Sequence, residues 1–274
     1  TYCVSLGLYV KTLPFNMAET LSEESSDIFK DMLQNLTLED LCEVRDFAIY
    51  HSEHSKTLVD IILSYIQVVS DPPQKQIARL KLVSEVLLNC NNTEVPQVWS
   101  YRRHLLGKLP SIFNFLNKVA KYHSQESQVF SECSQVLLDW EVSSVFDAKF
   151  IRGLEFNLTF KDSEINGEFF RVYREALSMC EEVVLRVKCK NNGLISRGSI
   201  DKLVGRLTKF QAFKVRKNSV SNINEVTLKL DQGNLEGIQP LEIVEQLESY
   251  TEPSLTGEQI FQQITQKHSR VKST

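Results

Sequence analysis

The stretch QKQIARLKLVSEVLLN, residues 74–89, decides how this chain folds. Its apolar residues recur every three or four positions, so the stretch predicts a helix that is buried on most of its sides. Asp71 precedes it as a cap, and Pro72 and Pro73 occupy first-turn positions where proline is tolerated. A polar edge remains along the helix, formed by Lys75, Arg79, Lys81, Ser84 and Asn89. This edge is either solvated surface or the floor of a binding groove.

The composition is that of a globular protein. The chain has 274 residues, of which 42% are hydrophobic and 24% charged, and its net charge of −4 argues against binding polyanions by bulk charge. No apolar run approaches the roughly 18 residues of a membrane-spanning helix. Six cysteines without a CxxC pair and only five histidines disfavour a zinc cluster and a dense disulfide framework, and favour reduced intracellular thiols.

Residues 25–160 read as consecutive helices with short connections. Helix-start signals recur along this part of the chain, at Ser25 or Ser26, at the capping-box-like residues 37–40, at Pro96 and at Ser124. Seven or eight helices result, and no run has the alternation of a strand. The pattern therefore predicts an all-α stack of antiparallel helices.

Residues 161–274 have a different pattern. One helix is expected at 168–179, after which residues 183–189 and 226–230 alternate between apolar and other residues, as strands do. The two runs could pair in one small sheet. Further helices are expected at 199–207, at 240–247 and after a capping box at Thr256. The overall expectation is a mainly α fold followed by a small α+β extension.

Charge is unevenly distributed in this second part. Residues 186–217 hold ten bases and one acid, which gives +9, and residues 225–258 hold one base and eight acids, which gives −7. One interpretation is a phosphate-facing surface for RNA or a phosphorylated partner, and the other is that the two blocks lie against each other. The phosphate-binding candidates are Arg186, Lys188, Lys190, Arg197, Lys202, Arg206, Lys209, Lys214, Arg216 and Lys217.

The sequence contains none of the common catalytic motifs. A GxGxxG loop, a Walker loop, GxSxG and HExxH are all absent. His51 and His54 lie three residues apart beside Glu53, which is more typical of a solvated helix end than of a metal site. We therefore expect no enzyme activity, no cofactor and no metal.

Four segments together resemble a known domain. Residues 72–90 (PPQKQIARLKLVSEVLLNC) resemble the central helix of the CTD-interacting domain, which binds the C-terminal tail of RNA polymerase II. The runs at 36–66, 102–119 and 136–155 follow in the order and spacing of that domain, and the closest version is that of the SURP-motif splicing factors associated with the branch-site snRNP. The resemblance implies a right-handed superhelix of about eight helices, related to VHS and ENTH domains, over residues 22–160. Residues 1–21 then form an N-terminal extension, and residues 161–274 are not recognised.

The resemblance also implies a peptide groove along the central helix. Family members hold an extended phosphopeptide with an Asp in this helix, an Asn one turn beyond it, and a basic residue on the helix that ends in a Trp. Asn89 matches the Asn, Ser84 stands at the Asp position, and the helix before Trp140 carries no Arg or Lys. That absence argues against bidentate binding of a serine phosphate. A basic rim is expected from Lys75, Arg79, Lys81, Arg102 and Arg103.

The sequence thus leads to the hypothesis of a non-enzymatic nuclear module of a pre-mRNA splicing factor. The superhelix acts as a scaffold or binds polymerase-tail peptide or spliceosomal proteins, and the basic extension touches RNA or a spliceosomal protein. One alternative is a VHS/ENTH-like trafficking adaptor that binds sorting peptides and anionic membrane. Another is a small-GTPase exchange-factor fragment, which rests on the short pieces ISRGSIDKLVGRL and IQPLEIVEQL. A purely architectural role is the last alternative.

Overall fold

The computed structural model describes residues 21–90, 97–160, 165, 167–217 and 239–249. These ranges contain α-helices, one short 3-10 helix and no strand. The helices are α1 (Glu23–Gln34), α2 (Leu41–Tyr50), η1 (Ser52–His54), α3 (Ser55–Ile66), α4 (Pro73–Asn89), α5 (Ser100–Leu106), α6 (Leu109–Tyr122), α7 (Glu126–Val142), α8 (Ala148–Thr159), α9 (Glu168–Ser178), α10 (Glu182–Asn191), α11 (Ile200–Lys217) and α13 (Pro240–Ser249).

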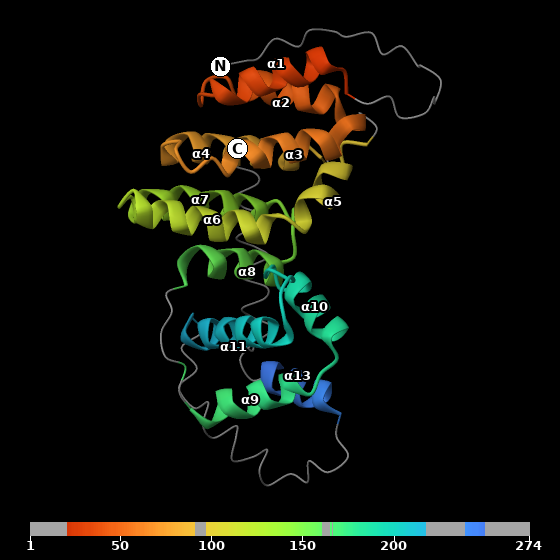
Figure 1. The fold of residues 1–274 in the computed structure, drawn as a ribbon, viewed down its shortest axis with the longest axis vertical. Helices are drawn as coiled ribbons and strands as arrows, with labels where there is room; N and C mark the ends of the chain where they lie inside the picture. The colour runs from red at the N-terminus through yellow and green to blue at the C-terminus, as the bar shows by residue number, and fades with distance from the viewer. Residues whose placement is uncertain (1–20, 91–96, 161–164, 166, 218–238, 250–274) are drawn as a thin grey trace.

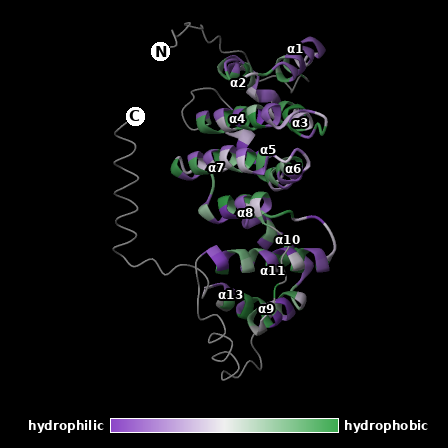
Figure 2. Ribbon diagram, turned by 90° about the vertical axis from the view of Figure 1, so that its left-hand side faces the viewer, coloured by the Kyte–Doolittle hydropathy of each residue, from purple (hydrophilic) through white to green (hydrophobic). Residues whose placement is uncertain are grey.

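The helices are stacked in successive layers along one axis. Figure 1 shows α1 and α2 at one end, followed by α3 with α4, by α6 with α7, and by α8. The stack then continues through α10 and α11 to α9 and α13 at the other end. Each helix carries both hydrophobic and hydrophilic residues (Figure 2), as helices do when one face is buried between layers. None of the described helices is long and apolar enough to cross a membrane.

Helix α4 lies at the centre of the first half of the stack. It packs against α2, α3 and α7, and it also contacts α5 and α6. Most of its residues are buried, from Pro73 to Leu87, so the predicted helix that is covered on most of its sides is confirmed. Pro72 is the N-cap residue and Pro73 the first helical residue, where the missing N–H has no intrahelical partner to lose.

Two hydrophobic clusters hold the stack together, and α8 contributes to both. The larger cluster extends from Phe29 in α1 to Leu158 in α8. The second joins α9, α10, α11 and α13, and it includes Phe156 of α8, whose ring lies 5.6 Å from the rings of both Phe210 and Phe213. Residues two positions apart in one helix, Leu154, Phe156 and Leu158, therefore support both halves of the molecule.

The backbones of α8 and the end of α10 touch directly. A Cβ atom on Gly153 would lie 1.6 Å from the carbonyl oxygen of Asn192, and one on Gly193, where φ is +62°, would lie 2.2 Å from the carbonyl oxygen of Phe150. The side-chain amide of Asn157 donates to the carbonyl oxygens of both glycines, at 2.8 Å each. Only glycine permits this approach, so the junction between the two halves is closely packed.

The strand prediction for residues 183–189 was wrong, because these residues form α10. Their alternation also fits a helix. Leu185 and Cys189 are four residues apart and buried against the second cluster, whereas Val183 and Val187, also four apart, are 67% and 49% exposed. The described residues thus contain no small sheet and no α+β extension. The second predicted strand, 226–230, and the helix predicted after Thr256 lie outside the described residues.

Candidate peptide-binding groove

A groove of about 340 Å³ lies between the α1–α2 connection, α4 and α7. Its apolar part is formed by Leu36 and Leu38 from the connection and by Ile77 and Ala78 from α4. Leu38 is 57% exposed, so an apolar side chain is presented to solvent at the groove. Polar residues complete the lining: Asn35, Thr37, Gln74, Lys75, Lys81, Gln128 and Glu132.

A turn closed by Asp40 shapes the wall at residues 35–38. The Asp40 carboxylate accepts from the Thr37 hydroxyl at 2.6 Å and from the Thr37 backbone N–H at 3.3 Å. Asn35 ends α1, and its backbone N–H donates to the carbonyl oxygen of Asp31. This turn leaves Leu36 buried and Leu38 exposed, so the two leucines supply an inner and an outer apolar surface.

Both cations of the groove have partners. The Lys75 ammonium group donates to the carbonyl oxygen of Gln34 at 3.0 Å. Lys81 forms an ion pair with Glu132 of α7, with 2.7 Å between Nζ and Oε2, and this pair links α4 to α7. The groove therefore presents an apolar floor and a rim on which the charge of Lys81 is compensated by Glu132, while Lys75 keeps its positive charge.

Arg79 lies in the interior and not on the groove rim where the sequence placed it. It is 1% exposed, and it donates to the carbonyl oxygens of Leu33 (3.1 Å) and Tyr65 (2.7 Å) and to the Asp71 carboxylate. Its guanidinium also lies over the Tyr65 ring, 5.3 Å from the centroid. Arg79 thus joins α1, α3 and the start of α4, and it does not line the groove.

Ser84 and Asn89 are also engaged in the structure. The Ser84 hydroxyl is buried and accepts the indole N–H of Trp140 at 3.0 Å, which makes it a contact between α4 and α7. Asn89 is half-buried, and its side chain donates to the carbonyl oxygen of Glu85 at 2.8 Å. Arg102 lies over the Phe146 ring, and Arg103 is exposed on α5, and neither lines the groove.

The structure therefore brings together two of the seven predicted groove residues, Lys75 and Lys81. Sequence reasoning missed the apolar floor and the α7 side of the rim, represented by Gln128 and Glu132. The absence of bases on α7 was visible in the sequence. The acid that replaces them in the groove could not be located without knowing which face of α7 meets α4.

Many bases of the predicted phosphate-binding block are used inside the protein. Arg186 donates to the carbonyl oxygens of Ser196 and Gly198, and Arg206 donates to those of Ile195 and Arg197, so two guanidiniums hold four consecutive carbonyls of the α10–α11 connection. Partial burial lowers the pKa of Arg206.

Other members of the block contact different helices. Lys188 pairs with Glu248 of α13 at 3.1 Å, Lys217 pairs with Glu155 of α8, and the buried Lys214 lies over the Phe210 ring. The Lys188–Glu248 pair joins the basic block to the acidic one, as the second interpretation of the charge pattern expected. Lys190, Arg197, Lys202 and Arg216 are exposed, and Lys209 is half-buried.

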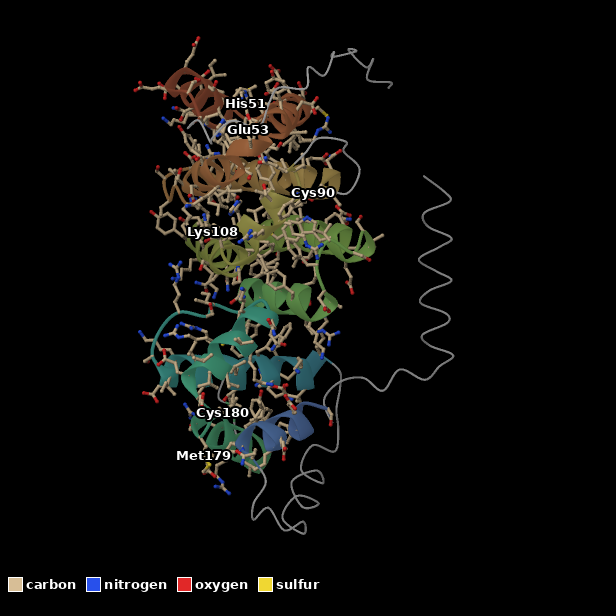
Figure 3. The ribbon with its side chains drawn as sticks, turned by 90° about the vertical axis from the view of Figure 1, so that its right-hand side faces the viewer. His51, Glu53, Cys90, Lys108, Met179 and Cys180 are labelled. Atoms are coloured by element: carbon tan, nitrogen blue, oxygen red, sulfur yellow. The ribbon has the colours of Figure 1, made fainter. Side chains whose placement is uncertain are left out.

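The described residues provide no candidate catalytic or metal centre. His51 and Glu53 lie close together (Figure 3). His51 Nδ1 and His54 Nε2 are 4.0 and 3.5 Å from the Glu53 carboxylate, and partial burial lowers the pKa of His51. No cluster of three or more His, Cys, Asp or Glu side chains in these ranges is placed to hold a metal ion. Burial raises the pKa of the thiols of Cys90 and Cys189 to about 11 and that of Cys133 to about 12, which keeps them protonated at neutral pH.

Comparison with known families gives a class for the layered helices and the groove beside α4. Residues 27–154 match the CID domain family, and this part of the chain is a CID domain. The CID domain is a non-catalytic interaction module with a superhelical fold, and CID domains bind the C-terminal tail of RNA polymerase II.

Two plant proteins are distant relatives of this chain. Protein RRC1-like from Arabidopsis thaliana is 29% identical over 143 residues, which are 50% of this chain and 15% of that protein. Protein RRC1 from the same plant is 27% identical over 164 residues, 57% of this chain and 17% of that protein. The chain thus spans less than a fifth of the length of these curated relatives. No solved structure matches it.

Proposed function

We propose that the chain is a non-enzymatic interaction module of a nuclear pre-mRNA splicing factor, and that its groove binds an extended peptide of the polymerase-tail type. The observation that supports this most is the groove itself, with Leu36, Leu38, Ile77 and Ala78 below a polar rim beside the central helix of a CID domain. Such a surface fits a peptide that inserts apolar side chains and is bonded at its edges. The splicing and nuclear assignments rest on the resemblance to SURP-motif splicing factors and on the similarity to the RRC1 proteins.

Peptide binding can be tested by fluorescence anisotropy with the full chain and a labelled peptide of two polymerase-tail repeats. We expect a Kd in the micromolar range. Leu38→Glu should weaken binding about tenfold or more, because it places a charge on the apolar side of the groove. Val69→Glu is the matched control, since Val69 is also 57% exposed but does not line the groove. Equal loss in the two variants, or no binding by the unmodified chain, would contradict the proposal.

A second candidate function is RNA binding at the α10–α11 surface. The observation that favours it is the net charge of +9 in residues 186–217, of which Lys190, Arg197 and Lys202 are exposed on or next to these helices. Phosphate contacts of this kind make binding weaken steeply with salt. Titration with a labelled single-stranded RNA should show this dependence, and Arg197→Glu with Lys202→Glu should weaken binding. Lys118→Glu, an exposed site on α6, should not, and salt-insensitive binding would count against an RNA role.

The membrane-adaptor and exchange-factor alternatives stay predictions. Liposome co-sedimentation and a nucleotide-release assay respectively test them.

A further inference from the structure

The α7 side of the groove is acidic. Residues 126–142 contain Glu126, Glu132, Asp139 and Glu141 and no Lys or Arg. Of these acids, Glu132 lines the groove, with its side chain 38% exposed. A ligand in the groove therefore meets a carboxylate on the α7 side at a point accessible to solvent.

On the α7 side of the groove, the cation that could receive a phosphate is already engaged. Lys81 is paired with the Glu132 carboxylate, whereas Lys75 keeps its charge because its partner, the carbonyl oxygen of Gln34, is neutral. A phosphoserine carries a charge of about −1.5 to −2. On the α7 side of the groove it would have to draw Lys81 away from Glu132, and it would then lie beside the carboxylate that Lys81 had neutralised. The phosphate and the Glu132 carboxylate would repel each other, most strongly at low ionic strength.

A basic side chain in the ligand would instead be attracted to the Glu132 carboxylate. A guanidinium forms two parallel bonds with a carboxylate, whereas the Lys81 ammonium binds it as a single point charge. Lys81 is 29% exposed along its side chain, so it can turn to solvent when an arginine takes its place at Glu132. The apolar floor of Leu38 and Ile77 remains available for a neighbouring apolar residue of the same peptide.

We propose that the groove selects an unphosphorylated extended peptide that carries an arginine or lysine next to an apolar residue, and that Glu132 determines this specificity. The inference rests on the proposed peptide-binding function and adds the class of peptide. It assigns Glu132 a ligand-binding role and makes Lys81 its partner in the unliganded protein.

The test compares three labelled peptides of equal length on the full chain. They are two unmodified polymerase-tail repeats, the same repeats with serine phosphates, and the same repeats with one serine replaced by arginine. At low salt we expect the arginine peptide to bind most tightly. The phosphorylated peptide should bind roughly three- to tenfold more weakly than the unmodified one, with the difference shrinking as salt is added.

Two variants of Glu132 connect the specificity to this residue. Glu132→Arg should reverse the order, so that the phosphorylated peptide binds best, and Glu132→Gln should abolish the preference for arginine. Glu141→Arg makes the same charge change on the exposed part of α7 outside the groove and should leave the order unchanged. Far-UV circular dichroism checks that each variant is folded. If Glu132→Arg is not folded, the test relies on Glu132→Gln, which changes the side-chain volume little.

The outcomes separate the two proposals. Tighter binding of the phosphorylated peptide by the unmodified chain overturns the inference on specificity but leaves the groove as a peptide site. If both Glu132 variants bind the three peptides in the same order of affinity as the unmodified chain, the inference on specificity is likewise overturned and the groove remains a peptide site. If none of the three peptides binds, the proposed peptide-binding function fails, and the inference fails with it.

Discussion

Arg79 shows how a single residue can differ from its apparent role in the sequence. Its position on the polar edge of a helix is typical of a solvated or ligand-binding arginine, yet the side chain is buried and bonded to Leu33, Tyr65 and Asp71. A buried guanidinium is tolerated only when its donors are satisfied. These bonds hold the carboxyl-terminal parts of α1 and α3 to the start of α4, next to the residues that shape the groove.

Removing Arg79 should therefore destabilise the protein strongly. We expect Arg79→Ala to lower the free energy of unfolding by about 3–5 kcal/mol, because it breaks a buried charge pair and leaves acceptors without donors. Arg79→Lys should recover only part of this loss, since an ammonium group cannot reproduce the planar set of donors. Urea unfolding followed by circular dichroism measures both. Lys75→Ala is the control and should cost less than about 1 kcal/mol, as is usual for a partly exposed lysine. A loss below that level for Arg79→Ala would contradict the assigned role.

Two buried tyrosines give the protein a dependence on alkaline pH. Tyr101 donates to the carbonyl oxygen of Ala48 at 2.6 Å and Tyr173 to the Glu248 carboxylate at 2.7 Å. Burial raises the pKa of both phenols above the ordinary value of 10. Above pH 10 the unfolded chain loses these protons and the folded chain keeps them, so the free energy of unfolding falls as the pH rises.

The buried thiols act in the same direction from about pH 9, their ordinary pKa, up to about 11. We expect the urea midpoint to decrease steadily between pH 9 and 11. Tyr101→Phe should show a shallower decrease at the upper end of this range, because one of the titrating groups is gone. A midpoint that stays constant from pH 9 to 11 would show that these groups titrate alike in the folded and unfolded chain.

At the scale of elements, the sequence showed where regular secondary structure lies in the second half better than it showed whether an element is a helix or a strand. Helix α4 was predicted correctly because its apolar stripe is long and its start is marked by Pro72 and Pro73. Helix α10 was read as a strand because, over seven residues, apolar positions two apart are also apolar positions four apart. These residues form a helix because α11 packs against it and buries Leu185 and Cys189. A local sequence pattern does not reveal such a packing partner.

The candidate site was predicted only in part for a related reason. Lys75 and Lys81 line the groove, as the sequence predicted, because the central helix and its polar edge could be identified, and their role in binding stays a prediction. Whether a residue on that edge reaches the groove or the core depends on where α1, α3 and α7 lie, and this separates Lys81 from Arg79 and Ser84. Glu132 could be assigned to the groove only once α7 was seen against α4.

The glycine contacts between α8 and the end of α10 should be the most sensitive point of the element packing. Gly153→Ala and Gly193→Ala place a Cβ atom against backbone, and Gly193 also has a positive φ, so each should lower the free energy of unfolding by more than about 2 kcal/mol. Gly205→Ala is the control. A Cβ there meets nothing within 4 Å, and alanine in the interior of α11 should stabilise by about 0.5–1 kcal/mol.

These three variants can be compared by thermal unfolding. If Gly153→Ala and Gly193→Ala unfold at the same temperature as the unmodified chain, then the close approach of α8 and α10 does not contribute to stability. The junction variants and the control should therefore shift the unfolding temperature in opposite directions.

At the scale of the whole molecule, the question is whether the stack unfolds as one unit. The sequence predicted a boundary at residue 160 between a helical domain and a separate second region. In the structure Phe156 belongs to the second cluster, while Leu154 and Leu158 of the same helix belong to the first. The two clusters also share the junction at Gly153 and the Lys217–Glu155 pair. This arrangement favours cooperative unfolding, in which loss of one cluster exposes the face of α8 that supports the other.

The tryptophans allow this cooperativity to be measured. Trp99 and Trp140 both precede residue 160, so their fluorescence reports on the first half, whereas far-UV circular dichroism reports on all helices. Leu203→Ala removes a fully buried side chain from α11 in the second cluster and should cost about 2–5 kcal/mol. If the stack is one unit, this substitution shifts the tryptophan transition and the circular dichroism transition together. Val187→Ala, on the exposed face of α10, should shift neither by much. If the two halves are independent domains, the tryptophan transition of Leu203→Ala stays in place and the circular dichroism curve separates into two steps, because the first half then does not depend on the packing of the second.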